Sequence, residues 1–372
     1  MKITIERGLL LKVLTHIQGV VERRNTIPIL SNVKFEAPDG QLSLNATDMD
    51  IDIVETVPAE ISEAGATTAP AHTLFDIVRK LPEGAQVELA CSGGDSQMTL
   101  SAGRSKFKLT CLPTEDFPVL SGGDLPNLFS LSASDLRTLI DCTKFAISTE
   151  ETRYYLNGIY LHAADNNGVV VLRTVATDGH RLASVELPLP DGAAGMPGVI
   201  VPRKAVNELR KLIDESDDDI EISLSDTKIR FSFNGTVLTS KLIDGTFPDY
   251  DRVIPVDNDK VMEVDTKQFA DAVDRVSTIS TEKSRAVKLS ITNGNLTLSA
   301  NSPENDTATE ELPIEYDSSE VEIGFNSRYL LDIAHQIEGS MVRFTLADAA
   351  SPTLVQDLED SSALYVLMPM RV

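Results

Sequence analysis

The stretch Asn293-Gly294-Asn295-Leu296-Thr297-Leu298-Ser299-Ala300 joins a hairpin-turn dipeptide to a run in which apolar and polar residues alternate. Two further turn dipeptides, Asp39-Gly40 and Asn167-Gly168, precede alternating runs of the same kind, and the three turns lie 128 and 126 residues apart. This spacing is the size of a small domain and is too long for a solenoid repeat. The sequence therefore predicts one domain plan that occurs three times in 372 residues.

Other segments keep the same order around each turn. A strand-like and then a helix-like segment precede the turn, and a second helix and further strands follow it. The expected helices are residues 9–21 and 74–81 in the first copy, 135–146 and 206–213 in the second, and 267–276 and 330–337 in the third. Strands dominate and most are joined by hairpin-length turns, so we expect antiparallel sheets and an α+β fold class.

The three copies are expected to form domains at residues 1–124, 125–254 and 255–372. Pro, Gly and Asp cluster between them, in the segments 121–127 and 248–260. Both segments are short, so the domains should be held in fixed succession. At about 125 residues, each domain is large enough to bury its own core.

Composition and short motifs indicate the cellular compartment and whether a metal or cofactor is bound. The cysteines, Cys91, Cys111 and Cys142, show no close pairing, which favours a reducing compartment. No signal-peptide pattern opens the chain, and no apolar run approaches the about 20 residues of a membrane span. We therefore expect a cytoplasmic protein. The histidines lack metal-ligand spacing and neither nucleotide-binding fingerprint occurs, so no metal or cofactor is expected.

Charge supports two interpretations. The chain has 33 Lys plus Arg against 57 Asp plus Glu, a formal net charge of −24, which taken alone predicts a highly soluble protein that does not bind nucleic acid. Two of the helical segments are nevertheless basic, because residues 6–24 carry a net charge of +2 and residues 203–213 a net charge of +3. If the helices lined one surface and the strands the other, the protein would be basic within and acidic outside.

The segment Thr177-Asp178-Gly179-His180-Arg181-Leu182 is the best candidate for chemistry. Asp178 and His180 are close enough to act as an acid–base pair, but Ser184 lacks the flanking glycines of a nucleophile elbow. The alternatives are a turn with a solvated histidine and a binding surface. Both are favoured over catalysis.

Three other motifs each have a structural and a functional interpretation. Asp48, Asp50 and Asp52 alternate as in a calcium loop, but the glycine and the distal glutamate of an EF-hand are absent, so a solvated strand face is expected. The tyrosines of Arg153-Tyr154-Tyr155-Leu156 suit phosphate contact or base stacking, or lie on opposite faces of a strand. Met368-Pro369-Met370 suits an adaptable binding surface, or ends a strand buried in its own domain.

Several motifs, in this order, resemble the beta subunit of bacterial DNA polymerase III, the sliding clamp family. The most specific are Pro28-Ile29-Leu30, residues 153–158, 176–182, 201–204 and 247–250, and Met368-Pro369-Met370-Arg371. The resemblance implies a head-to-tail homodimer in which six copies of one domain form a ring, with helices lining the hole and antiparallel sheets outside. It also implies a processivity factor, a noncatalytic accessory subunit of the polymerase III holoenzyme.

The resemblance implies that double-stranded DNA passes through the ring without sequence-specific contacts, so that weak phosphate contacts permit sliding. The residues that it assigns to DNA contact are Arg24, Tyr154, Tyr155, Arg203 and Lys204, with Arg79 and Arg137 as further candidates.

A second implied surface is an apolar cleft between the second and third domains. It takes short extended peptides from the polymerase III catalytic subunit, the clamp loader, other polymerases and repair proteins, which then compete for one cleft per subunit. The residues carried over to it are Arg153, Tyr155, Leu156, Thr177, Gly179, His180, Arg181, Leu182, Pro248, Arg252, Val253, Val366, Met368, Pro369, Met370 and Arg371.

Ring closure would join the first domain of one chain to the third domain of the next. The residues assigned to this interface are Arg104, Lys106, Phe107 and Leu109 on one side and Ile279 on the other, with the two cations facing Glu or Asp. The chain departs from familiar clamps at His72-Thr73, Glu150-Glu151 and Thr278. These departures predict weaker DNA contact and a looser ring.

Two other hypotheses stay open from the sequence. The first is an acidic three-domain scaffold that binds peptides but not DNA. The second is a hydrolase that uses Asp178 and His180.

Overall fold

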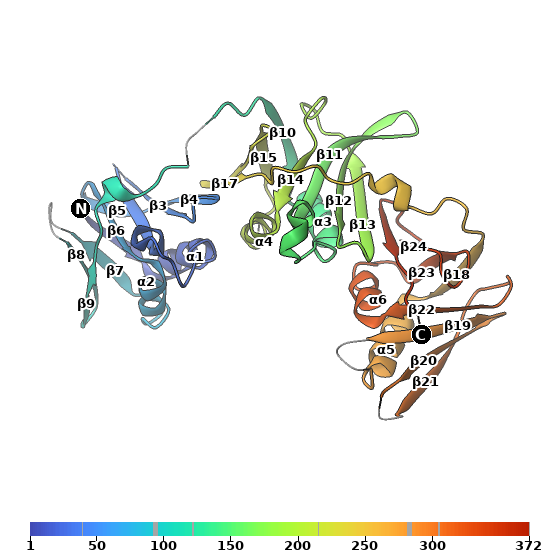
Figure 1. Cartoon of the computed structure of the whole chain (residues 1–372). Helices are drawn as coiled ribbons and strands as arrows, with labels where there is room; N and C mark the ends of the chain where they lie inside the picture. The colour runs from blue at the N-terminus through green and yellow to red at the C-terminus, as the bar shows by residue number, and fades with distance from the viewer. Residues whose placement is uncertain are drawn as a thin grey trace. The chain divides into compact units, whose positions relative to one another are not determined.

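The computed structural model describes residues 1–38, 40–91, 96–120, 123–214, 216–280, 285–303 and 306–371 (Figure 1). Asp39 of the first predicted turn, and Ser121 and Gly122 of the first predicted linker, lie outside these ranges. Contacts divide the chain into two compact units. The first unit comprises Met1–Arg137, Pro190–Pro197 and Lys204–Leu242, and the second comprises Thr138–Leu189, Gly198–Arg203 and Ile243–Val372.

The first unit contains two antiparallel sheets, with strand orders β5-β1-β7-β8-β9 and β10-β15-β16-β17-β4-β3-β2-β6. Its strands are β1 (Lys2–Glu6), β2 (Asn32–Ala37), β3 (Gln41–Thr47), β4 (Ile51–Pro58), β5 (Glu60–Glu63), β6 (Gly65–Pro70), β7 (Gln86–Ala90), β8 (Gln97–Ala102), β9 (Ser105–Thr110), β10 (Asn127–Ser132), β15 (Asp219–Leu224), β16 (Lys228–Phe233) and β17 (Thr236–Lys241). Its helices are α1 (Arg7–Ile17), α2 (Ala71–Val78) and, from Lys204 onward, α4 (Arg203–Leu212), with short 3-10 turns at Pro28–Ser31 and Thr114–Asp116.

Helix α1 shows how the apolar pattern builds this unit. Its buried positions, Leu10, Val13, Leu14 and Ile17, recur at helical spacing, and the helix contacts β3 and β4. The carboxylate of Glu6 accepts a hydrogen bond from Leu9 N at 3.0 Å and caps the first turn. The helix therefore begins two residues before its predicted start and ends four residues before its predicted end.

The second unit also contains two antiparallel sheets, with strand orders β14-β11-β12-β13-β25-β24-β23-β18 and β21-β20-β19-β22. Its strands are β11 (Gly158–Asn166), β12 (Val169–Thr177), β13 (Arg181–Pro188), β14 (Val199–Pro202), β18 (Lys260–Asp265), β19 (Ala286–Thr292), β20 (Asn295–Asn301), β21 (Thr307–Pro313), β22 (Val321–Asn326), β23 (Met341–Leu346), β24 (Thr353–Asp357) and β25 (Ala363–Leu367). Helices α5 (Thr266–Ser277) and α6 (Ser327–Ala334) contact each other, α3 (Ala133–Lys144) crosses the boundary between the units, and 3-10 turns occur at Glu151–Leu156 and Tyr250–Val253.

The predicted α+β class with antiparallel sheets is confirmed, and a helix is present at each of the six predicted positions. Several strands were not predicted, among them β17 and β24, in which polar residues (Thr and Ser in β17, Thr, Gln and Asp in β24) interrupt the apolar alternation. In the described ranges no helix is long and apolar enough to cross a membrane, and no group of three or more His, Cys, Asp or Glu is placed to hold a metal ion.

Each eight-stranded sheet joins strands of two successive copies. In the first unit β17 of the second copy pairs with β4 of the first, and in the second unit β25 of the third copy pairs with β13 of the second. The last strand is therefore not confined to its own domain, which corrects one of the two interpretations of the Met368-Pro369-Met370 end. Both joins are antiparallel and involve the same two strands of the domain plan.

Candidate functional site

The segment that follows β12 is a tight turn with a defined set of hydrogen bonds. Thr177 Oγ1 donates to Arg181 O (2.7 Å) and accepts from Gly179 N (3.1 Å). Asp178 Oδ1 accepts from His180 N (2.9 Å) and Arg181 N (3.0 Å). Gly179 has a φ of +87°, a left-handed conformation that glycine adopts without strain. The Thr-Asp-Gly sequence is thus explained by the turn itself.

This geometry does not support the hydrolase hypothesis. The carboxylate of Asp178 is engaged by the backbone N–H groups of His180 and Arg181 and by Arg181 Nε at 3.2 Å, rather than by the imidazole ring of His180. Ser184 is buried within β13. The segment therefore offers no nucleophile and base within hydrogen-bond reach of each other.

A second turn, after β3, has the same hydrogen bonds. Thr47 Oγ1 donates to Ile51 O (2.8 Å), and Asp48 Oδ1 accepts from Asp50 N (2.9 Å) and Ile51 N (2.7 Å). Asp52 follows in β4, where burial raises the pKa of its carboxyl to about 6. The expected solvated strand face is therefore wrong: Asp48 and Asp50 lie in the turn before β4, and Asp52 is half-buried within β4.

Segments far apart in the sequence meet around the 177–182 turn. Met368 N donates to His180 O at 2.9 Å, which fixes the end of the chain against the turn. Tyr155 packs against an apolar cluster formed by Leu156, Val175, Leu182, Ile200, Phe247, Tyr250 and Val366. Three residues expected to contact a peptide, Leu156, Leu182 and Val366, thus belong to one cluster, and Val253 and Met368 expose 40% and 37% of their surface.

Two of the cations assigned to the peptide surface, Arg153 and Arg252, are paired with carboxylates. Arg153 donates to the Glu150 carboxylate through Nε (2.9 Å) and Nη2 (2.7 Å), and this pairing lowers the pKa of Glu150. A Cβ placed on Gly179 would lie 2.5 Å from Arg153 Nη1, so the guanidinium lies directly over the turn. Arg252 Nε lies 2.6 Å from Asp249 Oδ2. The region therefore presents apolar surface edged by neutralised charges.

A polar relay anchors the segment that carries Pro248 and Val253. Arg173 Nη1 donates to Tyr250 Oη (3.0 Å), which in turn lies 2.8 Å from His162 Nε2. Burial and the Arg173 charge lower the pKa of His162 to about 4, so its ring is neutral near pH 7. With Arg173 donating to Tyr250 Oη, the tyrosine hydroxyl is placed to donate to His162 Nε2. Tyr160 stacks on His162 with ring centroids 4.2 Å apart.

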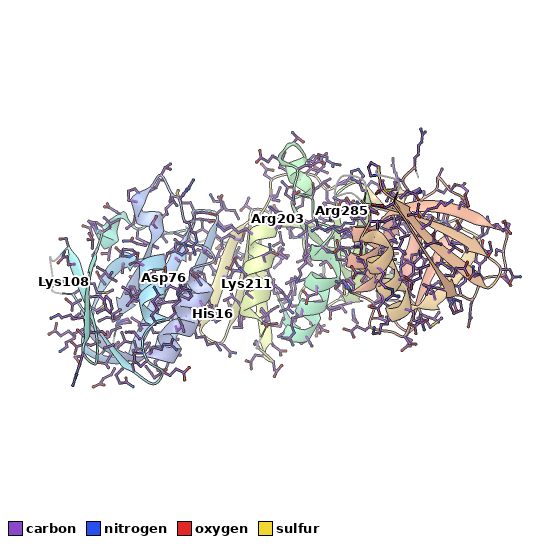
Figure 2. The ribbon with its side chains drawn as sticks, turned by 90° about the horizontal axis from the view of Figure 1, so that it is seen from below. His16, Asp76, Lys108, Arg203, Lys211 and Arg285 are labelled. Atoms are coloured by element: carbon purple, nitrogen blue, oxygen red, sulfur yellow. The ribbon has the colours of Figure 1, made fainter. Side chains whose placement is uncertain are left out.

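The residues assigned to DNA contact occur in both units. Arg24 is exposed in the first unit, where Arg79 Nη2 pairs with Asp76 at 3.0 Å. In the second unit Tyr154 is 53% exposed, its ring is edge-on to that of Tyr155, and Arg203 is exposed at the start of α4 (Figure 2).

Two further cations of that set are held by internal partners in the first unit. Lys204 Nζ lies 2.5 Å from Glu22 Oε1 and 2.7 Å from Asp48 Oδ2. Arg137 Nη1 donates to the carbonyl oxygens of Ile213 and Ser216, both at 2.7 Å. Both side chains therefore use their charge to hold neighbouring segments of the first unit together.

A pocket of about 610 Å³ in the first unit was not anticipated from the sequence. Lys12 and His16 of α1, Lys211 of α4, and Glu55 of β4 contribute to its lining, and Figure 2 shows His16 and Lys211 on neighbouring helices. His16 Nδ1 lies 2.9 Å from Glu55 Oε2. The +2 and +3 charges of residues 6–24 and 203–213 were a partial signal for it.

The residues assigned to a subunit interface lie near the edges of the smaller sheets. Arg104 and Lys106 are exposed and Phe107 is half-buried, at β9, the last strand of its sheet. Leu109 is buried in the core of the first unit, opposite Met98 of β8. Ile279 is half-buried just after α5.

Comparison with known proteins gives the same family along the whole chain. Models of the N-terminal, central and C-terminal domains of the DNA polymerase III beta subunit match residues 1–121, 130–249 and 251–371. The chain belongs to the beta sliding clamp family. The beta sliding clamp of Caulobacter vibrioides is 54% identical over 372 residues, and that of Escherichia coli K12 is 40% identical over 373 residues, with full coverage of both chains in each case.

Solved structures of clamps agree with this assignment. The sliding clamp of Bartonella birtlesii bound to griselimycin is 53% identical, has a TM-score of 0.97 and covers each chain completely. The chain is therefore a DNA sliding clamp built from three clamp domains. Sequence reasoning missed residues of two kinds. Glu150, Asp332 and Tyr329 contact Arg153 or Arg181 at the turn, and His162 and Arg173 hold Tyr250 in the segment 248–253. Of these, Glu150 alone gave a signal, as a departure from familiar clamps.

Proposed function

We propose that this clamp forms a ring as a head-to-tail homodimer, encircles duplex DNA, and tethers replication and repair proteins through short peptides at the surface around the 177–182 turn. The observation that carries the proposal is the repeated join between successive copies. β17 pairs with β4, and β25 pairs with β13. In each case the last strand of one copy pairs with a strand of the preceding copy, namely the strand that follows the 47–51 or the 177–182 turn.

A third join of the same kind needs a second chain. The strand that corresponds to β4 and β13 in the third copy is β21, and the strand that corresponds to β17 and β25 in the first copy is β9. Both stand at the end of their sheets in the described chain. Pairing β9 with β21 of the partner subunit is a heterologous contact, which gives a closed ring when the rotation per join fits.

The register of the two existing joins predicts the register of the third. Leu238 lies opposite Ile53, and Tyr365 lies opposite Ala183. Phe107 occupies the corresponding position in β9, so it should lie opposite Ala308 of the partner subunit. Arg104 and Lys106 then face a strand that contains Glu310 and Glu311. Buried Leu109 supports β9 from within, and Ile279 extends the contact.

DNA contact is assigned to Arg24, Arg79, Arg137, Tyr154, Tyr155, Arg203 and Lys204, without sequence specificity. Exposed Arg24, Arg203 and Tyr154 can meet phosphate directly, whereas Lys204 and Arg137 are held by internal partners and would have to exchange them for phosphate. The net charge of −24 keeps DNA away from the rest of the surface.

The peptide surface should accept segments of the polymerase III catalytic subunit, the clamp loader, and other polymerases and repair proteins. Exposed Val253 and Met368 accompany a buried apolar cluster, Gly179 lies where a ligand backbone can approach, and Arg153 and Arg252 are neutralised by carboxylates. We assign the domains to residues 1–124, 125–254 and 255–372, and infer a noncatalytic subunit of the holoenzyme that acts in the cytoplasm.

Retention on DNA tests the ring. The purified chain is loaded onto nicked circular plasmid, and one half of the sample is then linearised. A clamp that encircles DNA stays on circles and is lost from linear ends, and light scattering gives the mass of a dimer. Equal loss from both forms, or a monomer at the working concentration, would leave the peptide-binding scaffold as the function.

A further inference from the structure

Arg181, at the end of the 177–182 turn, is a charged residue with a relative exposure of 7%. Each of its guanidinium nitrogens has a partner. Nε lies 3.2 Å from Asp178 Oδ2, Nη1 lies 2.6 Å from Asp332 Oδ2, and Nη2 donates to Phe145 O at 2.5 Å. The guanidinium thus has an acceptor at each nitrogen and is largely withdrawn from the surface.

Two aromatic rings complete this enclosure. The Arg181 Cζ atom lies 4.2 Å from the centroid of the Tyr329 ring and 5.1 Å from that of Phe145. Both distances are within the range of a cation–π contact. Stacking on a ring restrains the orientation of the guanidinium plane as well as its position, so the side chain is fixed in orientation.

The partners of Arg181 come from two copies of the domain plan. Phe145 and Asp178 belong to the second copy, whereas Tyr329 and Asp332 lie on α6 of the third. The backbone of Arg181 closes the turn, because its carbonyl oxygen accepts the Thr177 hydroxyl. A single side chain therefore connects the position of α6 to the position of the turn.

We propose that Arg181 is a positioning residue for the peptide surface, which acts through Asp332 and Tyr329 of α6, and that the peptide itself is touched by its neighbours. This inference rests on the proposed peptide function and refines it, because family resemblance placed Arg181 among the residues that contact the peptide. The adjacent Gly179 and His180 are exposed, and buried Leu182 supports them from the apolar cluster beneath.

An equivalent tie in the first unit supports this role. Lys204, near the start of α4, binds Asp48 of the 47–51 turn at 2.7 Å. There too a turn of one copy is tied by a buried or half-buried ion pair to the second helix of the next copy. An ion pair between the turn of one copy and the second helix of the next therefore occurs in both units. This repetition is expected of a residue that positions the turn.

The test changes two residues of α6 and leaves the residues assigned to the peptide surface unaltered. Asp332→Asn removes one carboxylate partner of Arg181, and Tyr329→Leu removes one ring. The matched control is Glu263→Gln, which breaks another Arg–carboxylate pair of the third copy, with Arg343 at 2.8 and 2.7 Å, away from the turn. The probe is a fluorescein-labelled decapeptide from the clamp-binding segment of a bacterial DNA polymerase III catalytic subunit, and its binding is followed by fluorescence polarisation.

We expect Asp332→Asn and Tyr329→Leu each to weaken the binding of this probe about tenfold, mainly through faster dissociation, because the turn loses its fixed position. Glu263→Gln should change the affinity less than about twofold, the range expected for an uncoupled site. Amide hydrogen exchange at 178–182 should rise in the two α6 variants and stay unchanged in the control. Arg181→Lys should restore part of the affinity lost in Arg181→Met.

Two results would overturn the inference. One is unchanged probe affinity in both α6 variants together with loss of binding in Arg181→Met, which would show that Arg181 touches the peptide directly. The other is an equal loss in the Glu263→Gln control, which would show a general loss of stability. Failure of the unaltered chain to bind the probe would instead reject the proposed peptide function.

Discussion

The 47–51 turn of the first unit and the 177–181 turn of the second have the same backbone and opposite surfaces. In both, a threonine hydroxyl and an aspartate carboxylate satisfy the same amide and carbonyl groups. In both, a strand from the next copy donates an N–H to the turn, Lys241 N to Asp50 O at 2.8 Å and Met368 N to His180 O at 2.9 Å.

The side chains at these equivalent positions differ in character. Lys241 Nζ lies 3.0 Å from Asp50 Oδ1, so an ion pair lies across the first turn. The second turn has His180 and Met368 at those positions, with apolar Leu182 where the first has Asp52. The Thr-Asp pair thus fixes the shape of the turn, and a few side chains decide whether it presents charges or apolar surface to a partner.

Removing the aspartate of each turn should produce the largest effect and an unequal one. Asp178→Ala leaves two backbone N–H groups and the buried Arg181 with fewer partners, and should lower the free energy of unfolding by about 4 kcal/mol. Asp48→Ala has the half-buried Lys204 as its ionic partner and should cost about 2 kcal/mol. Urea denaturation of the two variants measures the difference, and equal losses would show that burial of the cation is not what distinguishes the turns.

The two units should respond to pH in opposite directions. His162 has a folded pKa of about 4 against 6.5, so between these values only the unfolded chain binds its proton, and stability falls as pH falls. Asp52 has a folded pKa of about 6 against 3.8, so only the folded chain binds its proton in that window, and stability falls as pH rises. Each effect amounts to about 3 kcal/mol at most.

The measurement compares urea midpoints of the unaltered chain, His162→Gln and Asp52→Asn between pH 4 and 7.5. The stability of Asp52→Asn relative to the unaltered chain should increase with pH, and that of His162→Gln should decrease. Parallel curves for all three proteins would show that neither group titrates as its burial requires.

The third position of each turn should respond to substitution with opposite signs. Gly179→Ala puts a side chain on a φ of +87° and against Arg153, and should cost about 1 to 2 kcal/mol as well as peptide affinity. Met49→Gly relieves a φ of +78° at an exposed side chain and should stabilise by about 0.5 kcal/mol. Thermal denaturation measures both, and a loss of stability in Met49→Gly would mean that the Met49 side chain contributes packing.

Exchanging the charged pair of the first turn should have the smallest effect. The Asp50→His, Lys241→Met double variant removes an exposed ion pair and should change stability by less than about 1 kcal/mol. The dependence of its denaturation midpoint on salt should decrease, because the pair is screened in the unaltered chain. A larger loss would assign the pair a structural role in joining β17 to β4.

Sequence patterns were sufficient for the repeated plan and for most elements. The turn dipeptides and apolar periodicity located the helices, since local spacing determines which face is buried. The pairing of β17 with β4 was not predictable, because it joins residues about 185 positions apart and depends on exposed backbone edges rather than on side-chain pattern. The partners of Arg181 were missed for a similar reason: Asp332 and Tyr329 become neighbours of the turn only when two copies have folded together.

The pairing of strands between successive copies has a consequence for how such a chain changes over generations. Each join pairs the last strand of one copy with the strand after the Thr-Asp turn of the copy before it. A chain of any number of copies therefore keeps one unpaired strand of each kind, as β9 and β21 are here. Duplication or loss of a whole copy therefore leaves ends that still match each other. Copy number per gene and number of subunits per ring are then free to vary in inverse proportion, while the rotation at each join sets their product.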